Sequence, residues 1–451
     1  MEPVMTRLYL GFFPLLSLLL VGSEVGLLSE IRFTLLFGLG LAIFLVAALW
    51  GVRGYNLWVS LGCLGLGTVV GLLDSRSWYD FVVLLARGGT IVVFLSFIPS
   101  ISVALEKGRY FESLTIVIHQ NHGRGPARFF LLAGLLMVMS FVLNIGSIPT
   151  LQKLIGRSKL SKRFLSSIYS AGYSANILIS PFDALVQATI LGVGAAYGSY
   201  LFVGLGAVLF LFVLRALLQL FDPREEVEVT VNFSAEEVQV ARGVSLRLAL
   251  LISGLFVLTI VGNSFIPARY PLLLTGATIY LYSWIWGQSL GAGPGFLWKT
   301  DSGYTQSLLG YRGFLPFLMS AGFLGAILAQ TPLATVVTDW VAFERGGSVY
   351  LTLLLGAGLT GLFSLIGIHM LISISILSAI LNSTAMGLSS EQFALFLLLS
   401  WIGAMNISPL VPFSAVVGQT LGVSATRVSF RYNLMFGLGI IIFGPIFVLV
   451  F

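Results

Sequence analysis

Two stretches of this chain, about half its length apart, repeat the same order of polar, proline and small residues. Residues 176–193 and residues 406–423 both begin with asparagine, pass through a Pro-Phe pair and end in Leu-Gly-Val. The pairs start at Pro181 and Pro412, which are 231 positions apart (412 − 181). A polar, proline-broken phrase at corresponding places in two halves is typical of secondary transporters built from internal repeats.

The composition places the chain in a lipid bilayer. Hydrophobic residues make up 57% and charged residues 9% of the 451 residues, whereas soluble domains carry about 25% charged residues. Apolar runs of about 20 residues recur almost end to end, which predicts an all-α polytopic protein of the cell (inner) membrane. The single cysteine, Cys63, excludes an intramolecular disulfide and a cysteine-based metal site. The net charge of +6 gathers in loops and indicates orientation, so no nucleic-acid partner is expected.

The apolar run 129–155 is expected to enter and leave the membrane on the same side. Basic residues flank it at both ends, including Arg128 before it and Lys159 after it. Basic loops stay cytoplasmic, so a single crossing would place one basic cluster outside. The polar, proline-containing phrase 144–149 interrupts the run. These features predict a re-entrant hairpin with its tip at 144–149.

The run 347–382 predicts a second hairpin in the opposite orientation. It is too long for one span, and the phrase Gly367-Ile-His-Met370 breaks its middle. Its flanks carry little positive charge and are expected to lie outside.

Together these features predict about eleven crossings and two hairpins in two inverted repeats, with a cytoplasmic N-terminus and a working site at the midplane. The predicted domains are an N-terminal span (1–32), a first repeat (33–221, with hairpin 129–155 and broken helix 164–195), an acidic cytoplasmic linker (222–243) and a second, inverted repeat (244–451, with hairpin 347–382 and broken helix 391–424).

This organisation resembles the ion transporter superfamily, which includes the divalent anion/sodium symporters. The resemblance covers most of the chain and lies in the crossings, the opposed hairpins and the two discontinuous helices. Hairpin tips of the divalent anion/sodium branch carry Ser-Asn-Thr, whereas the tips here read 144–150 Asn-Ile-Gly-Ser-Ile-Pro-Thr and 367–373 Gly-Ile-His-Met-Leu-Ile-Ser. The branch therefore stays open. The resemblance implies an elevator-like motion and a homodimer.

The broken helices and hairpin tips supply the candidate binding residues. An unwound segment at membrane depth lines a cavity or is buried in protein. Its carbonyls, with Asn and Ser oxygens, can replace the hydration shell of Na+, and the next half-helix N-terminus can face an anion. The expected substrate- or ion-binding residues are Asn144, Ser147, Thr150, Ser174, Asn176, Ser180, Asp183, His369, Ser373, Asn406, Ser408 and Ser414. Na+, the one expected ion besides H+, is predicted at Asn144, Asn176, Asp183 and Asn406.

Two of these residues can titrate. A carboxylate at mid-membrane depth is expensive and usually functional, so Asp183 is expected to coordinate Na+ or carry a proton; a capping Asp is the structural alternative. His369, at the second hairpin tip, is expected to contact an anion or sense protons, with a packing histidine as the alternative. Arg215 lies near a predicted span end, where it is expected to snorkel.

The leading hypothesis is a secondary active transporter that moves a small, anionic solute with Na+ or H+. Two alternatives stay open. One is a cation/proton antiporter of the same fold. The other is the large membrane subunit of a tripartite permease, which implies a small membrane subunit and a periplasmic binding protein. The long polar segments 105–128, 222–243 and 289–312 lack a metal-ligand or nucleophile–base constellation, so no enzyme activity is expected.

Overall fold

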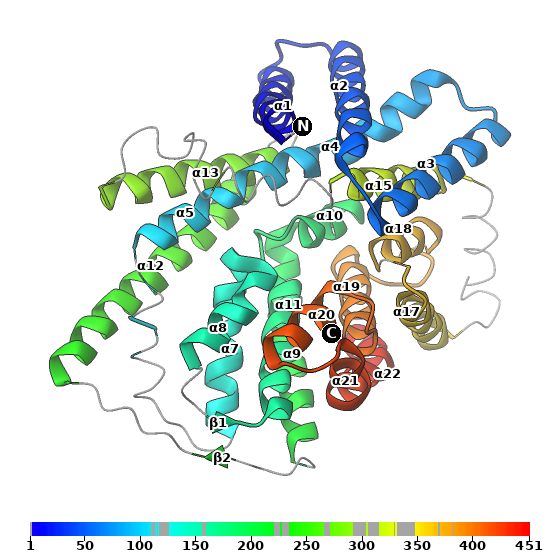
Figure 1. The fold of residues 1–451 in the computed structure, drawn as a ribbon. Coiled ribbons are helices and arrows are strands. Elements are labelled where there is room, and N and C mark those ends of the chain that lie inside the picture. Colours follow the sequence, from blue (N-terminus) through cyan, green and yellow to red (C-terminus); the bar gives the residue numbers. More distant parts are fainter. Residues whose placement is uncertain are drawn as a thin grey trace. The chain divides into compact units, whose positions relative to one another are not determined.

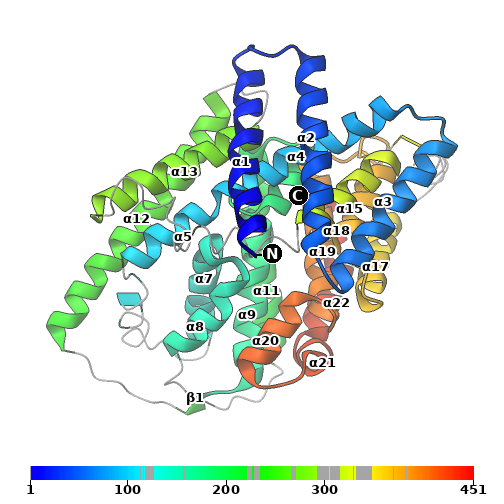
Figure 2. The same cartoon turned by 45° about the horizontal axis from the view of Figure 1, so that its top comes forward.

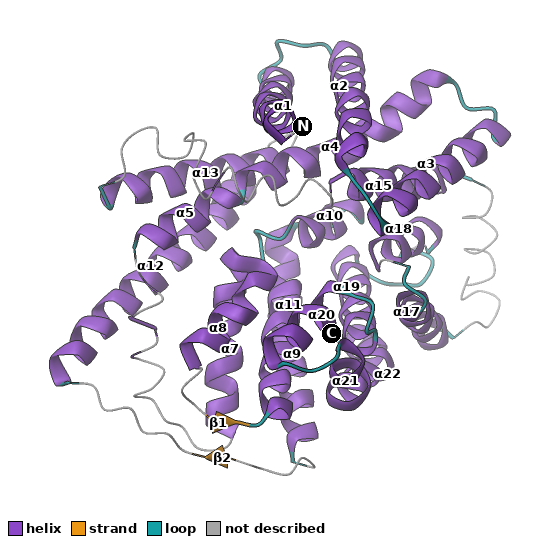
Figure 3. Cartoon of the chain, viewed as in Figure 1, coloured by secondary structure: helices purple, strands orange, loops and turns teal. Residues whose placement is uncertain are grey.

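A computed structural model shows an all-helical chain (Figure 1). It describes the whole chain except residues 1, 109, 111–112, 115, 117–125, 156–158, 221–225, 228–233, 266–270, 292–303, 305–314, 329, 332–347, 369 and 382. Helices dominate the described residues, and one pair of two-residue strands joins them (Figure 3). The prediction of an all-helical membrane chain is confirmed.

The elements follow one another along the chain with few long gaps. Those of the first half are α1 (Glu2–Glu24), α2 (Glu30–Gly51), α3 (Tyr55–Leu73), α4 (Trp78–Phe97), α5 (Pro99–Lys107), α7 (Pro126–Leu143), the 3-10 turn η1 (Asn144–Gly146), α8 (Ser147–Ile155), β1 (Lys159–Leu160), α9 (Lys162–Ile179), α10 (Ala184–Gly192), α11 (Tyr197–Gln219) and β2 (Glu226–Val227). Those of the second half are α12 (Ala235–Phe265), α13 (Pro271–Ser289), α15 (Leu315–Leu328), α17 (Val349–Leu365), α18 (Met370–Ile380), α19 (Ser390–Ile407), α20 (Pro412–Leu421), α21 (Ala425–Arg427), the π-helical turn η4 (Val428–Asn433) and α22 (Leu434–Val450).

In the described part of the chain, 7 helical stretches are long and apolar enough to cross a membrane, and shorter apolar helices accompany them. The chain is therefore a multi-pass membrane protein. The count of about eleven crossings, the inverted repeats, the domain limits and the orientation stay predictions.

The chain divides into two compact units. The first contains residues 1–107, 258–340 and 375–382, and the second contains residues 108–257, 341–374 and 383–451. Both units therefore combine segments from the two halves of the sequence.

In the first unit, α1 and α2 lie side by side, joined by a short turn (Figure 2). Helix α2 packs against α4, and α3 packs against α15. Leu84 of α4 forms a core cluster with Phe323 and Ile327 of α15.

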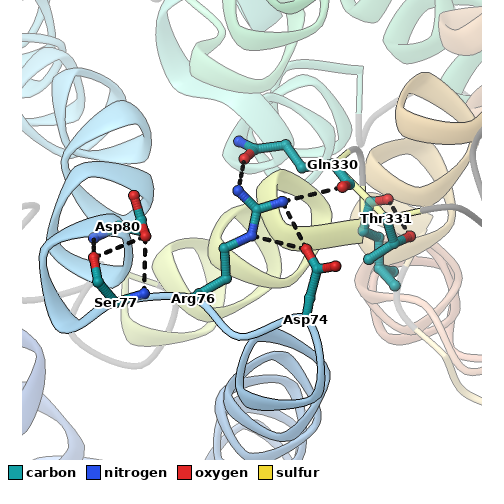
Figure 4. Close-up of polar contacts among 7 residues, drawn as sticks. Asp74, Arg76, Ser77, Asp80, Gln330 and Thr331 are labelled. Atoms are coloured by element: carbon teal, nitrogen blue, oxygen red, sulfur yellow. Dashed lines mark hydrogen bonds and ion pairs between the residues drawn. The ribbon is translucent and has the colours of Figure 1, made fainter.

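An arginine joins the α3–α4 turn to the end of α15 (Figure 4). Arg76 Nε donates to Asp74 Oδ2 over 2.9 Å, and one terminal nitrogen donates to Gln330 Oε1 over 2.7 Å. The other terminal nitrogen donates to the Gln330 carbonyl over 3.1 Å. Next to it, Ser77 and Asp80 form a capping box that starts α4.

In the second unit, two helices are buried on every side. Residues 165–180 of α9 with its C-cap, and residues 393–408 of α19 with its C-cap, are all buried. Helix α9 packs against α7 and α11, while α19 packs against α17 and α22. A helix enclosed all round forms the core of its domain, so polar residues on α9 and α19 need partners inside the protein.

The predicted linker 222–243 is partly ordered into regular structure. Its strand β2 pairs antiparallel with β1, with Leu160 opposite Glu226. Helix α12 begins at Ala235 and takes in the rest of the linker, because Ser234 and Glu237 form a reciprocal cap there. The hydrophilic linker is therefore shorter than the sequence suggested.

Candidate functional site

The first break, residues 180–183, separates α9 from α10. Pro181 lacks a backbone N–H, and Ser180 Oγ accepts from the Phe182 N–H over 3.2 Å, so the helix ends here. Helix α10 starts again after Asp183, whose carbonyl accepts from Gln187 N over 3.0 Å. Its carboxylate Oδ1 accepts from Val186 N over 3.4 Å. A buried carboxylate, 9% exposed, therefore occupies the positive end of α10.

The tip between α7 and α8 reaches this carboxylate. Asn144 adopts a left-handed backbone, with φ of 48°, which asparagine tolerates better than most residues. Its Nδ2 donates to Asp183 Oδ2 over 3.4 Å, and its Oδ1 accepts from the Tyr173 hydroxyl over 2.6 Å. Ser147 fixes the tip by donating to the Asn144 carbonyl over 2.7 Å. The tip, the break and α9 therefore meet at one polar cluster.

Two tyrosines of α11 occupy the carbonyls at the end of α9. The Tyr197 hydroxyl donates to the Ile179 carbonyl over 2.6 Å, and the Tyr200 hydroxyl donates to the Leu178 carbonyl over 2.9 Å. The expectation that free carbonyls of this break replace a hydration shell is therefore wrong for these two groups, because phenolic donors already satisfy them.

The second break, residues 408–411, separates α19 from α20. Ser408 is the C-cap of α19, and its Oγ accepts from Leu410 N over 3.2 Å and donates to the Ser364 carbonyl over 2.7 Å. Ser414 donates to the Ser408 carbonyl over 2.7 Å. Helix α20 begins with Pro412 after Val411, and no side chain caps its N–H groups.

The two breaks correspond by helix limits and not by their shared Pro-Phe pair. Ser180 and Ser408 are both C-caps, and each accepts from the N–H two residues on. They are 228 positions apart (408 − 180), whereas the Pro-Phe pairs are 231 apart (412 − 181). Pro181 therefore lies inside its break, but Pro412 is the first residue of α20. Pairing Asp183 with Ser414 from the sequence repeat is wrong, because Asp183 corresponds to the cap position of Val411.

Side chains connect the two breaks across α9 and α19. Asn406 Nδ2 donates to Ser174 Oγ over 3.3 Å. The rings of Tyr173 and Phe413 stack, with centroids 5.6 Å apart and planes 9° from parallel. Since Tyr173 also holds Asn144, the hairpin tip, the first break and the start of α20 form one connected site.

Buried asparagines in this region keep unused hydrogen-bonding atoms. Asn176 is 1% exposed, and neither its Oδ1 nor its Nδ2 has a hydrogen-bond partner among the described residues. Asn406 Oδ1 is likewise without a partner in the described part of the chain. Orphaned buried amides are costly, and oxygen atoms suit a hard cation. These two oxygens, with the carboxylate of Asp183, fit the expected Na+ ligands.

Comparison with known proteins identifies the fold. No known family profile and no curated protein sequence matches the chain. Among solved structures, the YdaH transporter of Alcanivorax borkumensis, described as having an unusual topology, matches with a TM-score of 0.59 and 18% identity, over 88% of this chain and 98% of that one. MtrF of Neisseria gonorrhoeae, described within a class of antimetabolite efflux pumps, matches with a TM-score of 0.56 and 12% identity, over 80% and 81%. The chain has the fold of these membrane transporters.

With this transporter fold, the predicted residues fall into three groups. The structure joins Asn144, Ser147, Ser174, Ser180, Asp183, Asn406, Ser408 and Ser414 through the contacts given above. Asn176 lies on α9 beside them, one turn beyond Tyr173. Thr150 turns its hydroxyl back to the Gly146 carbonyl over 2.8 Å, and Ser373 is buried on α18 with no hydroxyl partner among described residues. His369 lies outside the described residues.

Several contributors escaped the sequence reasoning. Tyr197 and Tyr200 begin a span, where tyrosines are usual at the membrane interface, so nothing marked them as caps. Arg215 is 3% exposed, so the snorkelling interpretation is wrong; neighbouring elements enclose its guanidinium. An arginine four residues before the end of an apolar helix was the available signal.

Proposed function

We propose that this protein is a secondary active transporter that moves a small anionic solute, coupled to Na+ or H+. The observation that carries the proposal is the hydrogen bond between Asp183 and Asn144. It links a buried carboxylate at a helix break to the tip of a helical hairpin. Among the described residues, Asp183 is also the one buried acidic side chain. An intramembrane carboxylate with a named polar partner is a functional site by default.

The two breaks have opposite electrostatic character. At the first break, Asp183 supplies negative charge and neutralises the start of α10. At the second break, no carboxylate or hydroxyl caps the start of α20. An uncapped helix N-terminus favours negative charge. We therefore assign the cation to the first break and the anionic solute to the second.

The Asn144–Asp183 hydrogen bond provides the coupling. A proton or Na+ on Asp183 reduces the charge that Asn144 Nδ2 faces, and a neutral acceptor makes a weaker hydrogen bond than an ionised one. The hairpin tip is then released, and Asn144 can turn its amide toward the solute. Binding of the cation thus changes the affinity for the anion, and by linkage the reverse holds.

The finer features remain part of the proposal. Alternating access by an elevator-like movement of the hairpins and broken helices, and assembly as a homodimer, follow from the resemblance to the ion transporter superfamily. MtrF is described within a class of antimetabolite efflux pumps, so export of an anionic antimetabolite is the direction to test first.

The test uses purified protein in proteoliposomes of defined orientation. Melting temperatures with a panel of anions, with Na+ or K+ and at two pH values, select a ligand, because a ligand of the folded state stabilises it by mass action. Uptake and export of that anion are then measured under a Na+ gradient and under a pH gradient. Anion movement driven by one gradient and absent without it supports the proposal. Equal movement without any gradient contradicts it.

A cation/proton antiporter is the second candidate, favoured by the lone buried carboxylate of Asp183 in the described chain. It predicts that Na+ raises the melting temperature without any anion and that low pH cancels the effect. Na+/H+ exchange in the same proteoliposomes, with no anion dependence, would replace the symporter by this antiporter.

A further inference from the structure

A buried arginine contacts three elements of the second unit. One terminal nitrogen of Arg215, on α11, donates to Ser167 Oγ over 2.8 Å, to the Tyr432 carbonyl over 3.0 Å and to Asn433 Oδ1 over 3.2 Å. Its guanidinium carbon also lies 5.2 Å from the ring centroid of Phe436 on α22. Ser166 donates to the same Asn433 oxygen over 3.2 Å. Helices α9, α11 and the start of α22 therefore converge on one side chain.

Two of these acceptors belong to a π-helical turn. Helix η4 covers Val428–Asn433, directly before α22. A π-turn has one more residue per hydrogen-bonded ring than an α-helix, and such turns occur mostly at functional sites. A donor that holds the Tyr432 carbonyl and the Asn433 side chain favours the π-turn over a regular α-helix.

The same π-turn contacts the second break. Ser429 Oγ lies 2.8 Å from Ser414 Oγ, and Ser414 donates to the Ser408 carbonyl over 2.7 Å. Removing one residue from the turn would rotate its start by about 100° relative to α22, because an α-helix has 3.6 residues per turn. Ser429 would then no longer face Ser414.

We propose that Arg215 is a positioning residue: it holds the π-turn 428–433 and thereby orients Ser414 and the second break toward the solute. This inference rests on the proposed transport function for its kinetic consequence. Its structural part, the dependence of the π-turn on Arg215, is independent of transport.

The structural test measures amide hydrogen exchange over 428–433 in the purified full-length protein. Arg215→Met is compared with deletion of Phe430, whose side chain is exposed, and with the combined variant. The deletion lets the turn become α-helical, so Arg215→Met is expected to speed exchange in the wild-type background and to have no further effect in the deletion background. Such a cycle isolates the coupling between the two changes. Equal effects in both backgrounds overturn the proposal.

The kinetic test measures transport of the anion found in the stability screen. Arg215→Met is expected to raise KM for the anion about tenfold, which is about 1.4 kcal/mol of lost binding, and to leave cation dependence unchanged. Arg215→Lys is expected to recover part of this loss, because an ammonium supplies donors without the planar fork. Arg431→Met is the control, since Arg431 lies in the same turn with an exposed side chain.

The outcomes separate the two proposals. A wild-type protein that moves no anion refutes the proposed function, while the exchange cycle still decides the role of Arg215. Loss of anion and cation dependence together in Arg215→Met, with unchanged exchange over 428–433, refutes the positioning role.

Discussion

Asp183 combines a structural task with a chemical one at a single carboxylate. Its Oδ1 caps α10 and its Oδ2 accepts from Asn144. An amide of the same shape keeps an acceptor oxygen for the cap but carries no charge. The two tasks can therefore be separated by a conservative substitution.

Asp183→Asn is expected to fold and to lose coupled transport. The cap survives through the amide oxygen, so the melting temperature stays within a few degrees, whereas Na+- or H+-driven transport falls to background. Asp74→Asn, at an exposed ion pair of the first unit, is the matched control and should transport normally. Uptake at the wild-type rate by Asp183→Asn in proteoliposomes would remove Asp183 from the mechanism.

Asn176→Leu is expected to stabilise the ligand-free protein and to abolish binding. Leaving a buried amide unpaired costs roughly 1–3 kcal/mol, and leucine has a similar size without the orphaned atoms. The melting temperature without ligand should rise, and the further rise caused by cation plus anion should disappear. A variant that is destabilised, yet still responds to ligand, would show that Asn176 only packs.

At the scale of elements, the interruptions of α9 and α19 follow from local chemistry. Prolines without an N–H, and serines that accept from the N–H two residues on, end a helix wherever they lie. The sequence therefore predicted both breaks and most of the polar residues around them. It misplaced their correspondence by three residues, because a matching Pro-Phe pair does not specify whether proline ends one helix or starts the next.

What the sequence could not supply were partners far away in the chain. The Tyr197 and Tyr200 caps, the stacking of Tyr173 on Phe413 and the enclosure of Arg215 all depend on which helices become neighbours. A tyrosine or an arginine near a span end has the same local pattern whether it faces lipid headgroups or a helix terminus. Tertiary packing decides between these roles.

Substituting both tyrosine caps tests the end of α9. The Tyr197→Phe/Tyr200→Phe variant removes two hydrogen bonds worth about 1 kcal/mol each and leaves two buried carbonyls without their donors. We expect a lower melting temperature and a changed response to cations, measured by thermal unfolding in NaCl and KCl. The variant Tyr350→Phe, at an exposed hydroxyl, is the control. An unchanged cation response would mean that the carbonyls take no part in ion binding.

Gly437→Ala tests the crossing of α19 and α22. A Cβ at Gly437 would lie 2.5 Å from Ile407 Cγ2, 2.9 Å from the Gly403 carbonyl oxygen and 3.2 Å from Asn406 Cβ. Overpacking of this kind costs about 1–3 kcal/mol, and the displaced residue carries the Asn406–Ser174 bond. We expect lower stability and weaker solute binding. Gly134→Ala, where a Cβ meets nothing within 4 Å, is the control, and equal losses in both variants would contradict the argument.

At the scale of the whole molecule, the site residues with printed contacts fall in the second compact unit. Residues 144, 183, 406 and 414 all lie in its ranges, whereas the Arg76–Gln330 contact lies in the first. A ligand can stabilise directly only the groups that it contacts.

Hydrogen exchange should therefore distinguish the two units. Cation plus anion is expected to slow exchange most in α9, α19 and α20 and least in α3 and α15. Arg76→Ala should affect α3 and the end of α15 only slightly, since partly exposed ion pairs contribute about 0–1 kcal/mol, and should leave ligand protection of the second unit intact. Protection that is strongest in α3 and α15 would place the binding site elsewhere.

The tyrosine caps also bear on which metal ions the protein accepts. With phenol hydroxyls on the carbonyls of Leu178 and Ile179, a cation at Asp183 is coordinated chiefly by mobile side-chain oxygens. Such ligands adjust to ions of different radius, unlike a rigid ring of backbone oxygens. Li+ should therefore replace Na+ with little loss, and discrimination against K+ should be modest.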